Sequence, residues 1–227
     1  MSRSACSACR RRLSLGHGYP SQLFFFLFLF LIALVSALGA CDGDNSGSPA
    51  ARPSAGAAST SPTPSLMTVG GVQLLLYRGD GFSIGYPRDW RVTPAGSSVE
   101  FSHEADNASV SVQIVPNPNA ATAPDDAIAA SLDAIGKSGL YKNYKRVRLP
   151  SSVRVGGEIW QQQGATGEVQ ILSQRVNMEV IMLATNHPAR SSQTRLFSIY
   201  MILPVARYQQ LYMSALGPML QSFRFLR

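Results

Sequence analysis

An unbroken apolar run, LFFFLFLFLIALVSALGA, occupies residues 23–40 and follows the basic triplet RRR at 10–12. This order of basic, apolar and small residues is typical of an export signal. The run is longer than the usual signal core of about 7–15 residues and close to the roughly 20 residues that cross a bilayer. Two interpretations therefore stay open, a signal peptide over 1–40 or an uncleaved membrane anchor. In both, the folded part of the chain begins after residue 40.

The run ends in LGAC at 38–41, which resembles the lipobox of bacterial lipoproteins. The resemblance implies that Cys41 is the lipidation site and the first residue after cleavage. Acyl chains such as palmitate would then hold the protein on the cell membrane, facing the extracytoplasmic side of the envelope. Cys6 and Cys9 would leave with the signal, so we expect neither an internal disulfide nor a free thiol nucleophile.

The formal charge of +7 is concentrated in the signal. Four arginines and no acid precede residue 41, and the rest of the chain has 16 bases and 13 acids. A net charge of +3 gives no electrostatic reason to expect nucleic-acid binding, so we expect no nucleic-acid partner.

Residues 42–68 consist mainly of Ser, Pro, Ala, Gly and Thr. Such a composition has too little apolar surface to offset the entropy of ordering and predicts a disordered linker. We therefore divide the chain into a signal peptide at 1–40, a lipidated cysteine and flexible tether at 41–69, and a globular domain at 70–227.

Within the globular part, period-two alternation and turn residues predict strands. They are expected at 72–77, 82–86, 98–102, 109–115, 141–149, 152–163, 168–176, 179–186 and 195–203. A helix is expected over 122–137, with Ile128, Leu132 and Ile135 on one stripe, and another from 208, interrupted at Gly217-Pro218. This order predicts an α+β fold in which α-helices cover an antiparallel β-sheet.

The stretch GFSIGYPRDW at 81–90 places aromatic residues on both sides of a proline. Phe82, Ile84 and Tyr86 alternate and are expected to point inward together. Pro87 suits a turn over 86–89 that returns Trp90 to the end of the core. We therefore interpret this motif as structural, with Arg88 and Asp89 at its exposed tip.

The same motif, preceded by Tyr77, resembles the opening hairpin of PsbP-like domains, and the closing YMILPVARYQQLYMSALGPMLQSFRF resembles their last strand and helix. The matching residues are Tyr77, Phe82, Ile84, Tyr86, Pro87, Trp90, Gly156, Ser222 and Phe223. The resemblance implies an α/β/α sandwich. Photosynthetic members of that family support the oxygen-evolving complex, and cyanobacterial relatives include lipoproteins. Its ion-linked residues have no motif that aligns here, so none is assigned.

Candidate chemistry is sparse. His103, Glu104 and Asp106 are weak candidates for a metal site, but neighbours on one short turn rarely complete a coordination sphere. His187 is the only other imidazole after the signal. No Gly-x-Ser-x-Gly, Ser-x-x-Lys or His-Glu-x-x-His motif is present, although a triad assembles in space rather than in sequence. We expect no metal, no cofactor and no enzymatic activity.

A basic segment, YKNYKRVRL, occupies residues 141–149. In an extended strand, Lys142, Tyr144, Arg146 and Arg148 would share one face and form a candidate interaction strip. Such a strip could meet an acidic partner or anionic lipid headgroups. The alternative is an ordinary solvated face.

These features together predict a lipid-anchored extracytoplasmic protein whose domain is a non-catalytic interaction or assembly module with a protein partner. One alternative is a ligand-capturing lipoprotein that serves a transporter, and another is a photosystem-associated assembly factor. A deep apolar pocket between helices and sheet would favour ligand capture, whereas a filled core with a flat basic face would favour the module.

Overall fold

The computed structural model describes residues 65–226. The predicted signal peptide, Cys41 and the tether up to residue 64 lie outside the described residues. Between residues 65 and 226, no helix has the length and apolar character needed to cross a membrane.

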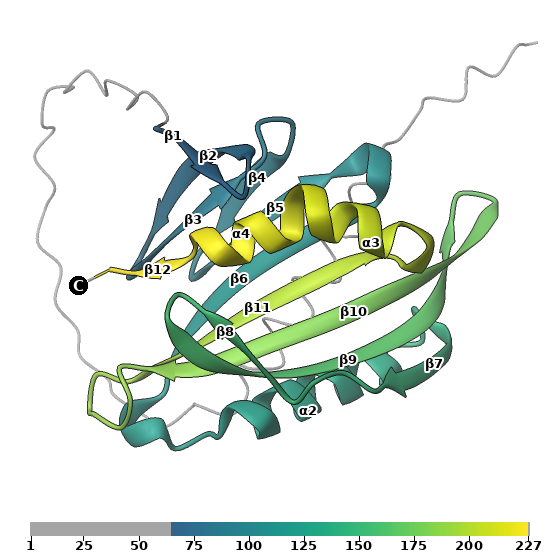
Figure 1. The fold of residues 1–227 in the computed structure, drawn as a ribbon. Coiled ribbons are helices and arrows are strands. Elements are labelled where there is room, and N and C mark those ends of the chain that lie inside the picture. Colours follow the sequence, from purple (N-terminus) through teal and green to yellow (C-terminus); the bar gives the residue numbers. More distant parts are fainter. Residues whose placement is uncertain (1–64, 227) are drawn as a thin grey trace, which may run out of the picture. The chain divides into compact units, whose positions relative to one another are not determined.

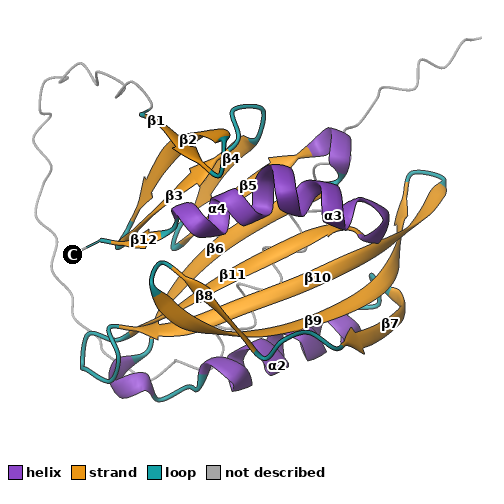
Figure 2. Ribbon diagram, in the orientation of Figure 1, coloured by secondary structure: helices purple, strands orange, loops and turns teal. Residues whose placement is uncertain are grey.

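The main sheet has eight strands in the order β4-β5-β6-β11-β10-β9-β7, and β8 pairs with β9 beside this path. All its pairs are antiparallel (Figure 1, Figure 2). Its strands are β4 (Arg91–Ala95), β5 (Ser98–His103), β6 (Ala108–Pro116), β7 (Lys142–Val147), β8 (Ser152–Val155), β9 (Glu158–Ile171), β10 (Gln174–His187) and β11 (Arg195–Pro204).

A second, four-stranded sheet has the order β1-β2-β3-β12. It contains β1 (Leu66–Val69), β2 (Val72–Gly79), β3 (Phe82–Tyr86) and the short C-terminal strand β12 (Arg224–Phe225). Because β1 is paired with β2, the ordered fold begins before the boundary that we expected at residue 70.

Helices lie on both faces of the main sheet (Figure 1). Helix α2 (Pro124–Lys137) packs on β9 and β10. The other face carries α3 (Tyr208–Leu211), the π-helical turn η4 (Tyr212–Leu216) and α4 (Gly217–Ser222). Short 3-10 turns are η1 (Glu104–Asp106), η2 (Pro118–Ala120) and η3 (Val205–Arg207). The predicted α+β fold, an antiparallel sheet covered by helices, is confirmed.

The main core lies between the large sheet, the C-terminal helices and the small sheet. Val110, Val112 and Ile114 of β6 enter it as the alternation predicted, together with Leu216 and Phe223 from the other side. The intervening residues of β6, Ser109, Ser111 and Gln113, are polar and belong to the face on the α2 side. On that face the predicted stripe of α2 is buried, which confirms the helix and its orientation.

The opening motif forms the expected corner. Phe82 and Ile84 are buried in the core, and the ring of Phe82 stacks on Phe223 at 5.6 Å. The Trp90 backbone N–H donates to the Pro87 carbonyl at 3.1 Å, so the turn runs over 87–90, one residue later than the expected 86–89, and Trp90 covers the end of the core. This motif is therefore a structural element of the fold.

Two strand predictions were wrong. The expected strand 152–163 is a hairpin, because Gly156 and Gly157 both adopt positive φ and reverse the chain. The expected strand 168–176 is the β9–β10 hairpin, which turns at Leu172 and Ser173. The sequence prediction also omitted β1, β4 and β12. Gly217-Pro218 does not break the last helix, which passes from a π turn directly into α4.

Candidate functional site

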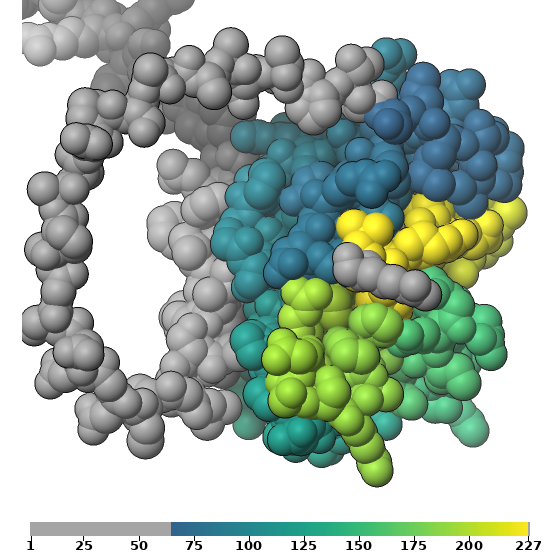
Figure 3. All heavy atoms as spheres, turned by 90° about the vertical axis from the view of Figure 1, so that its left-hand side faces the viewer, coloured from purple at the N-terminus to yellow at the C-terminus, as the bar shows by residue number. Residues whose placement is uncertain are grey.

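A cleft of about 610 Å³ opens where β10 turns into β11. Small-molecule pockets have volumes of about 300–1,000 Å³, and the cleft falls within this range. It is lined by Pro116, Pro118, His187, Pro188, Ser192, Gln193, Thr194, Arg195, Phe225 and Leu226. Figure 3 shows this end of the domain, with the yellow-green β10–β11 turn beside the yellow C-terminal segment.

Register places the turn at the end of the sheet, because His187 and Arg195 form the last β10–β11 pair. The turn is closed internally by Thr194, whose hydroxyl donates to the Pro188 carbonyl at 2.7 Å and accepts from the Ser191 N–H at 2.7 Å. These bonds fix the polar wall of the cleft.

The same turn is tied to the segment after β6 through Asn117. The Asn117 N–H donates to the Thr194 carbonyl at 2.9 Å, and its side-chain amide donates to Asn186 Oδ1 at 2.7 Å. Asn117 is 5% exposed, so these polar groups depend on one another for their hydrogen bonds. The cleft therefore has a rigid frame rather than an isolated loop as its wall.

His187 forms one side of the cleft. Its Nδ1 lies 2.7 Å from Glu158 Oε1, and its ring stacks on Phe225 with centroids 3.8 Å apart. The carboxylate and the phenyl ring together fix the orientation of the imidazole. Within residues 65–226, no hydrogen bond joins either histidine to a serine, threonine or cysteine.

Arg195, the cross-strand partner of His187, also lines the cleft. Its Nη1 lies 2.8 Å from Asp80 Oδ2, and its guanidinium carbon lies 5.3 Å from the ring centroid of Phe197. Gly81 has φ +77, and a Cβ there would meet Arg195 Nη2 at 1.9 Å. The turn that begins the opening motif therefore positions this cation. With its hydroxyl and amide groups, the cleft can hold a polar group against an apolar wall of proline and phenylalanine.

The predicted basic strip does not share a single face. A β-bulge between Lys142 and Lys145 adds one residue to β7, so these two lysines pair with Glu168 and Thr166 of β9. Residues 166 and 168 lie on the same face of β9, and Lys142 and Lys145 therefore share that face. Arg146 pairs with Ala165 and lies on the opposite face. The expected arrangement of Lys142 and Arg146 was wrong because the alternation shifts at the bulge.

Tyr144 and Arg146 make intramolecular contacts with α2. The Tyr144 hydroxyl donates to the Leu132 carbonyl at 2.7 Å, and burial raises the pKa of this phenol. Arg146 donates to Asp133 Oδ1 at 2.8 Å and to the Ala129 carbonyl at 3.1 Å. These two side chains therefore help to hold the helix. Arg148, which follows the strand, is exposed.

The weak metal candidates lie on η1 and the residue before it. His103 Nδ1 is buried 3.0 Å from Asp106 Oδ2 without forming a hydrogen bond, and Nε2 lies 3.4 Å from Asp89. Asp106 also pairs with Arg207, and Glu104 lies 3.7 Å from Arg91.

The His103 ring stacks on Trp90. Over residues 65–226, His, Cys, Asp and Glu side chains form no group of three or more that could hold a metal ion.

No protein-family model and no curated protein matches the chain. Solved structures with a similar fold include LpqN of Mycobacterium tuberculosis, described as involved in cell envelope biogenesis, at 13% identity and a TM-score of 0.41. That match covers 64% of this chain and 83% of LpqN. The Ran-binding protein Mog1p of Saccharomyces cerevisiae matches at 10% identity and a TM-score of 0.37, over 72% of this chain and 96% of Mog1p.

A protein of Bacteroides thetaiotaomicron matches at 13% identity and a TM-score of 0.34, over 65% of this chain and 46% of that one. At these identities and TM-scores the matches assign no family, and the PsbP-like resemblance stays a prediction.

Proposed function

We propose that residues 65–226 form a non-catalytic binding module of the cell envelope, which accepts a side-chain anchor of a partner protein in the cleft beside His187. The filled main core carries this proposal. Phe101, Trp160, Phe197 and Phe223 are each less than 2% exposed between the helices and the sheets. Capture of a ligand inside the domain would require the space that these side chains fill, whereas binding in a surface cleft leaves the core intact.

The chemistry of the cleft supports partner recognition. Phe225 and the prolines offer an apolar wall, and the exposed Ser192 and Gln193 offer polar groups at the rim. Protein interfaces commonly combine such a pocket, which takes one anchor side chain, with a polar rim. The His187 imidazole, oriented by Glu158 and stacked on Phe225, contributes a fixed hydrogen-bonding and stacking surface to the cleft.

The N-terminal sequence supports a location at a membrane. The LGAC motif marks Cys41 as the lipidation site, and the Ser/Pro-rich segment would be the tether. The narrower PsbP-like role, in photosystem assembly, is a variant of the same module.

Site-specific photo-crosslinking tests the proposal. A photoreactive residue at Gln193, on the cleft rim, is expected to form a protein adduct when the full chain is expressed in its native membranes. Gln209, which is exposed on α3, serves as the control position. An adduct at 193 that is absent at 209 supports the module, and equal labelling at both positions contradicts it.

A second candidate function, ligand capture, is favoured by the volume and the aromatic wall of the same cleft. It predicts that a small molecule copurifies with the full chain and is lost when Phe225 is changed to alanine. Native mass spectrometry of both proteins separates this function from protein binding, which predicts the bare chain mass in both.

A further inference from the structure

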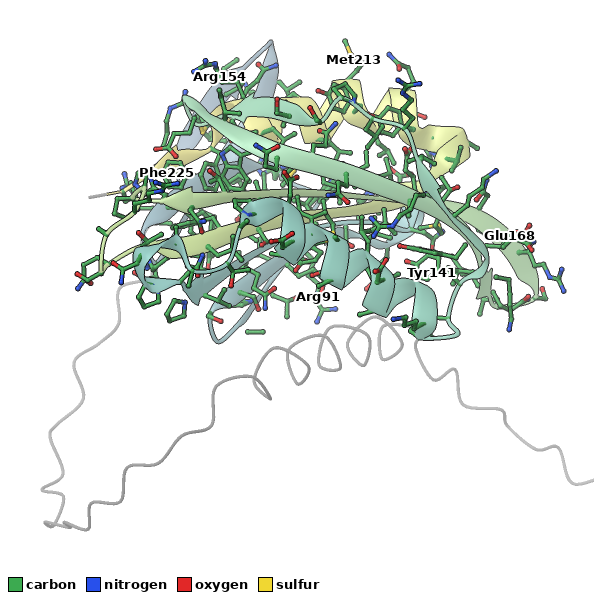
Figure 4. The ribbon with its side chains drawn as sticks, turned by 90° about the horizontal axis from the view of Figure 1, so that it is seen from below. Arg91, Tyr141, Arg154, Glu168, Met213 and Phe225 are labelled. Carbon is green, nitrogen blue, oxygen red and sulfur yellow. The ribbon has the colours of Figure 1, made fainter. Side chains whose placement is uncertain are left out.

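We propose that the end of the domain formed by the β9–β10 turn and the start of β7 docks onto an anionic lipid surface. We name this surface the basic end and define it by Lys137, Leu140, Lys142, Lys145, Leu172 and Arg175. The contact is distinct from the predicted Cys41 anchor and from the cleft. Figure 4 shows Tyr141 and Glu168 at this end of the sheet and Phe225, in the cleft wall, at the other.

The members of the basic end come from three elements that contact one another. A Cβ at Gly167 would lie 3.1 Å from Tyr141, which places the neighbouring Leu140 and Lys142 beside β9 near its last residues. Likewise, a Cβ at Gly136 would meet the Tyr144 ring at 2.8 Å, which places the C-terminus of α2 and Lys137 against β7. These contacts place Lys137, Leu140 and Lys142 at the end of the sheet from which the β9–β10 hairpin extends.

Leu172 is the feature that the fold does not explain. It is 83% exposed at the tip of a two-residue hairpin turn and has φ +54. Glycine usually occupies a turn position with positive φ, because other side chains are strained there. A large apolar side chain in this place contributes no packing and adds strain, which is the kind of outlier that marks a functional position. Leu140, 39% exposed, adds a second apolar group at this end.

The charge of the domain is also concentrated here. Residues 65–226 contain 14 bases and 11 acids, and the basic end has four of the bases with only Glu168 beside them. Ten bases and ten acids remain elsewhere, so this end accounts for the whole net positive charge of the described residues. Lysines and a bulge on an edge strand also prevent unwanted strand pairing, but that role does not require an exposed leucine.

An exposed leucine at the hairpin tip, with Arg175 on the same hairpin and Lys142 and Lys145 on the neighbouring strand β7, fits the boundary of an anionic bilayer. The apolar tip enters the region between headgroups and acyl chains, while the bases stay among the phosphates. An acidic protein surface would satisfy the bases but would leave Leu172 without an apolar partner, unless it also offered a pocket. The lipid surface therefore fits both observations.

The test measures contact of the tip with lipid. The full chain carrying Leu172→Trp is reconstituted in vesicles chosen to contain phosphatidylcholine and 30% phosphatidylglycerol. One set of vesicles has brominated acyl chains and a second set does not. Bromolipid is expected to quench the new tryptophan, and raised salt is expected to reduce the quenching. Ser173→Trp probes the same tip at a residue without positive φ, in case the first variant folds poorly.

The control tryptophan replaces Ile159, which is 59% exposed at the other end of β9, about 40 Å away along the strand. Changing Lys142 and Lys145 to glutamine should lower the ratio of docked to undocked domain about 30-fold, since each base contributes about fivefold near an anionic surface. Changing the exposed Arg78 and Arg88 to glutamine removes the same charge elsewhere and should leave quenching unchanged.

Quenching at position 172 no greater than at 159, or equal in pure phosphatidylcholine, overturns the proposal. The proposal is also overturned if changing Lys142 and Lys145 to glutamine abolishes a protein crosslink while the Leu172→Trp chain shows no quenching by bromolipid. That result assigns the basic end to an acidic protein partner.

Discussion

Replacing Phe223 with alanine tests whether the C-terminal segment is part of the core. The side chain is 0% exposed, and its ring contacts Phe82 at 5.6 Å, Trp160 at 5.3 Å and Phe225 at 5.1 Å. Truncation of a fully buried phenylalanine costs about 3–5 kcal/mol, because transfer energy is lost and a cavity remains. At about 2–4 °C per kcal/mol for a domain of this size, Tm should fall by about 6–20 °C.

Urea unfolding of the full chain, followed by tryptophan fluorescence, measures this loss directly because Trp160 lies against Phe223. Phe223→Leu keeps most of the volume and should cost less than about 2 kcal/mol. Phe225→Ala is the matched control, since that ring is only half-buried. If Phe223→Ala costs no more than Phe225→Ala, the closing motif does not anchor the opening hairpin and the reasoning fails.

Three further changes test local features. Burial raises the pKa of Tyr141 to about 12, so the unfolded chain loses the phenol proton near pH 10 while the folded chain keeps it. The free energy of unfolding therefore falls above pH 10. Tyr141→Phe should remove about 1 kcal/mol of that fall at pH 11, as measured by urea unfolding. Ser222→Ala should cost about 1–3 kcal/mol, because the buried Gly85 N–H loses its acceptor at 2.7 Å; unchanged exchange of that amide would argue against this. Gly81→Ala should cost about 1–2 kcal/mol from its positive φ and displace Arg195 from the cleft wall, and an unaltered Tm would contradict the strain argument.

The regular parts of the fold were predictable because their patterns are periodic. The alternation of β6 and the helical stripe of α2 each determine which side chains face the interior, and both were assigned correctly. The β8–β9 turn was missed although Gly156-Gly157 is a hairpin signal. The β9–β10 turn has no such signal, because Leu172 occupies a position that favours glycine.

The cleft could not be predicted because its walls come from separate segments of the chain. His187 was noted only as a second imidazole, and its partners Glu158 and Phe225 lie 29 and 38 residues away in sequence. The strip at 142–148 was misassigned for a local reason. One extra residue at the bulge moves Lys142 to the face opposite Arg146, and the only local signal for it is Asn143, which has φ +53 and is a residue type that tolerates this conformation.

The two proposed surfaces lie at opposite ends of one strand, and this gives them a functional relation. β10 has 14 residues and spans about 45 Å from the β9–β10 turn to His187. A domain that docks through the basic end therefore holds its cleft away from the lipid, where an extracytoplasmic partner can reach it. Because no described contact joins the Lys142–Lys145 pair to the cleft residues, glutamine at both lysines should reduce lipid quenching at 172 while leaving the protein adduct at 193 intact. If the adduct is lost together with the lipid contact, the docked state itself presents the partner, and the two ends act as one site.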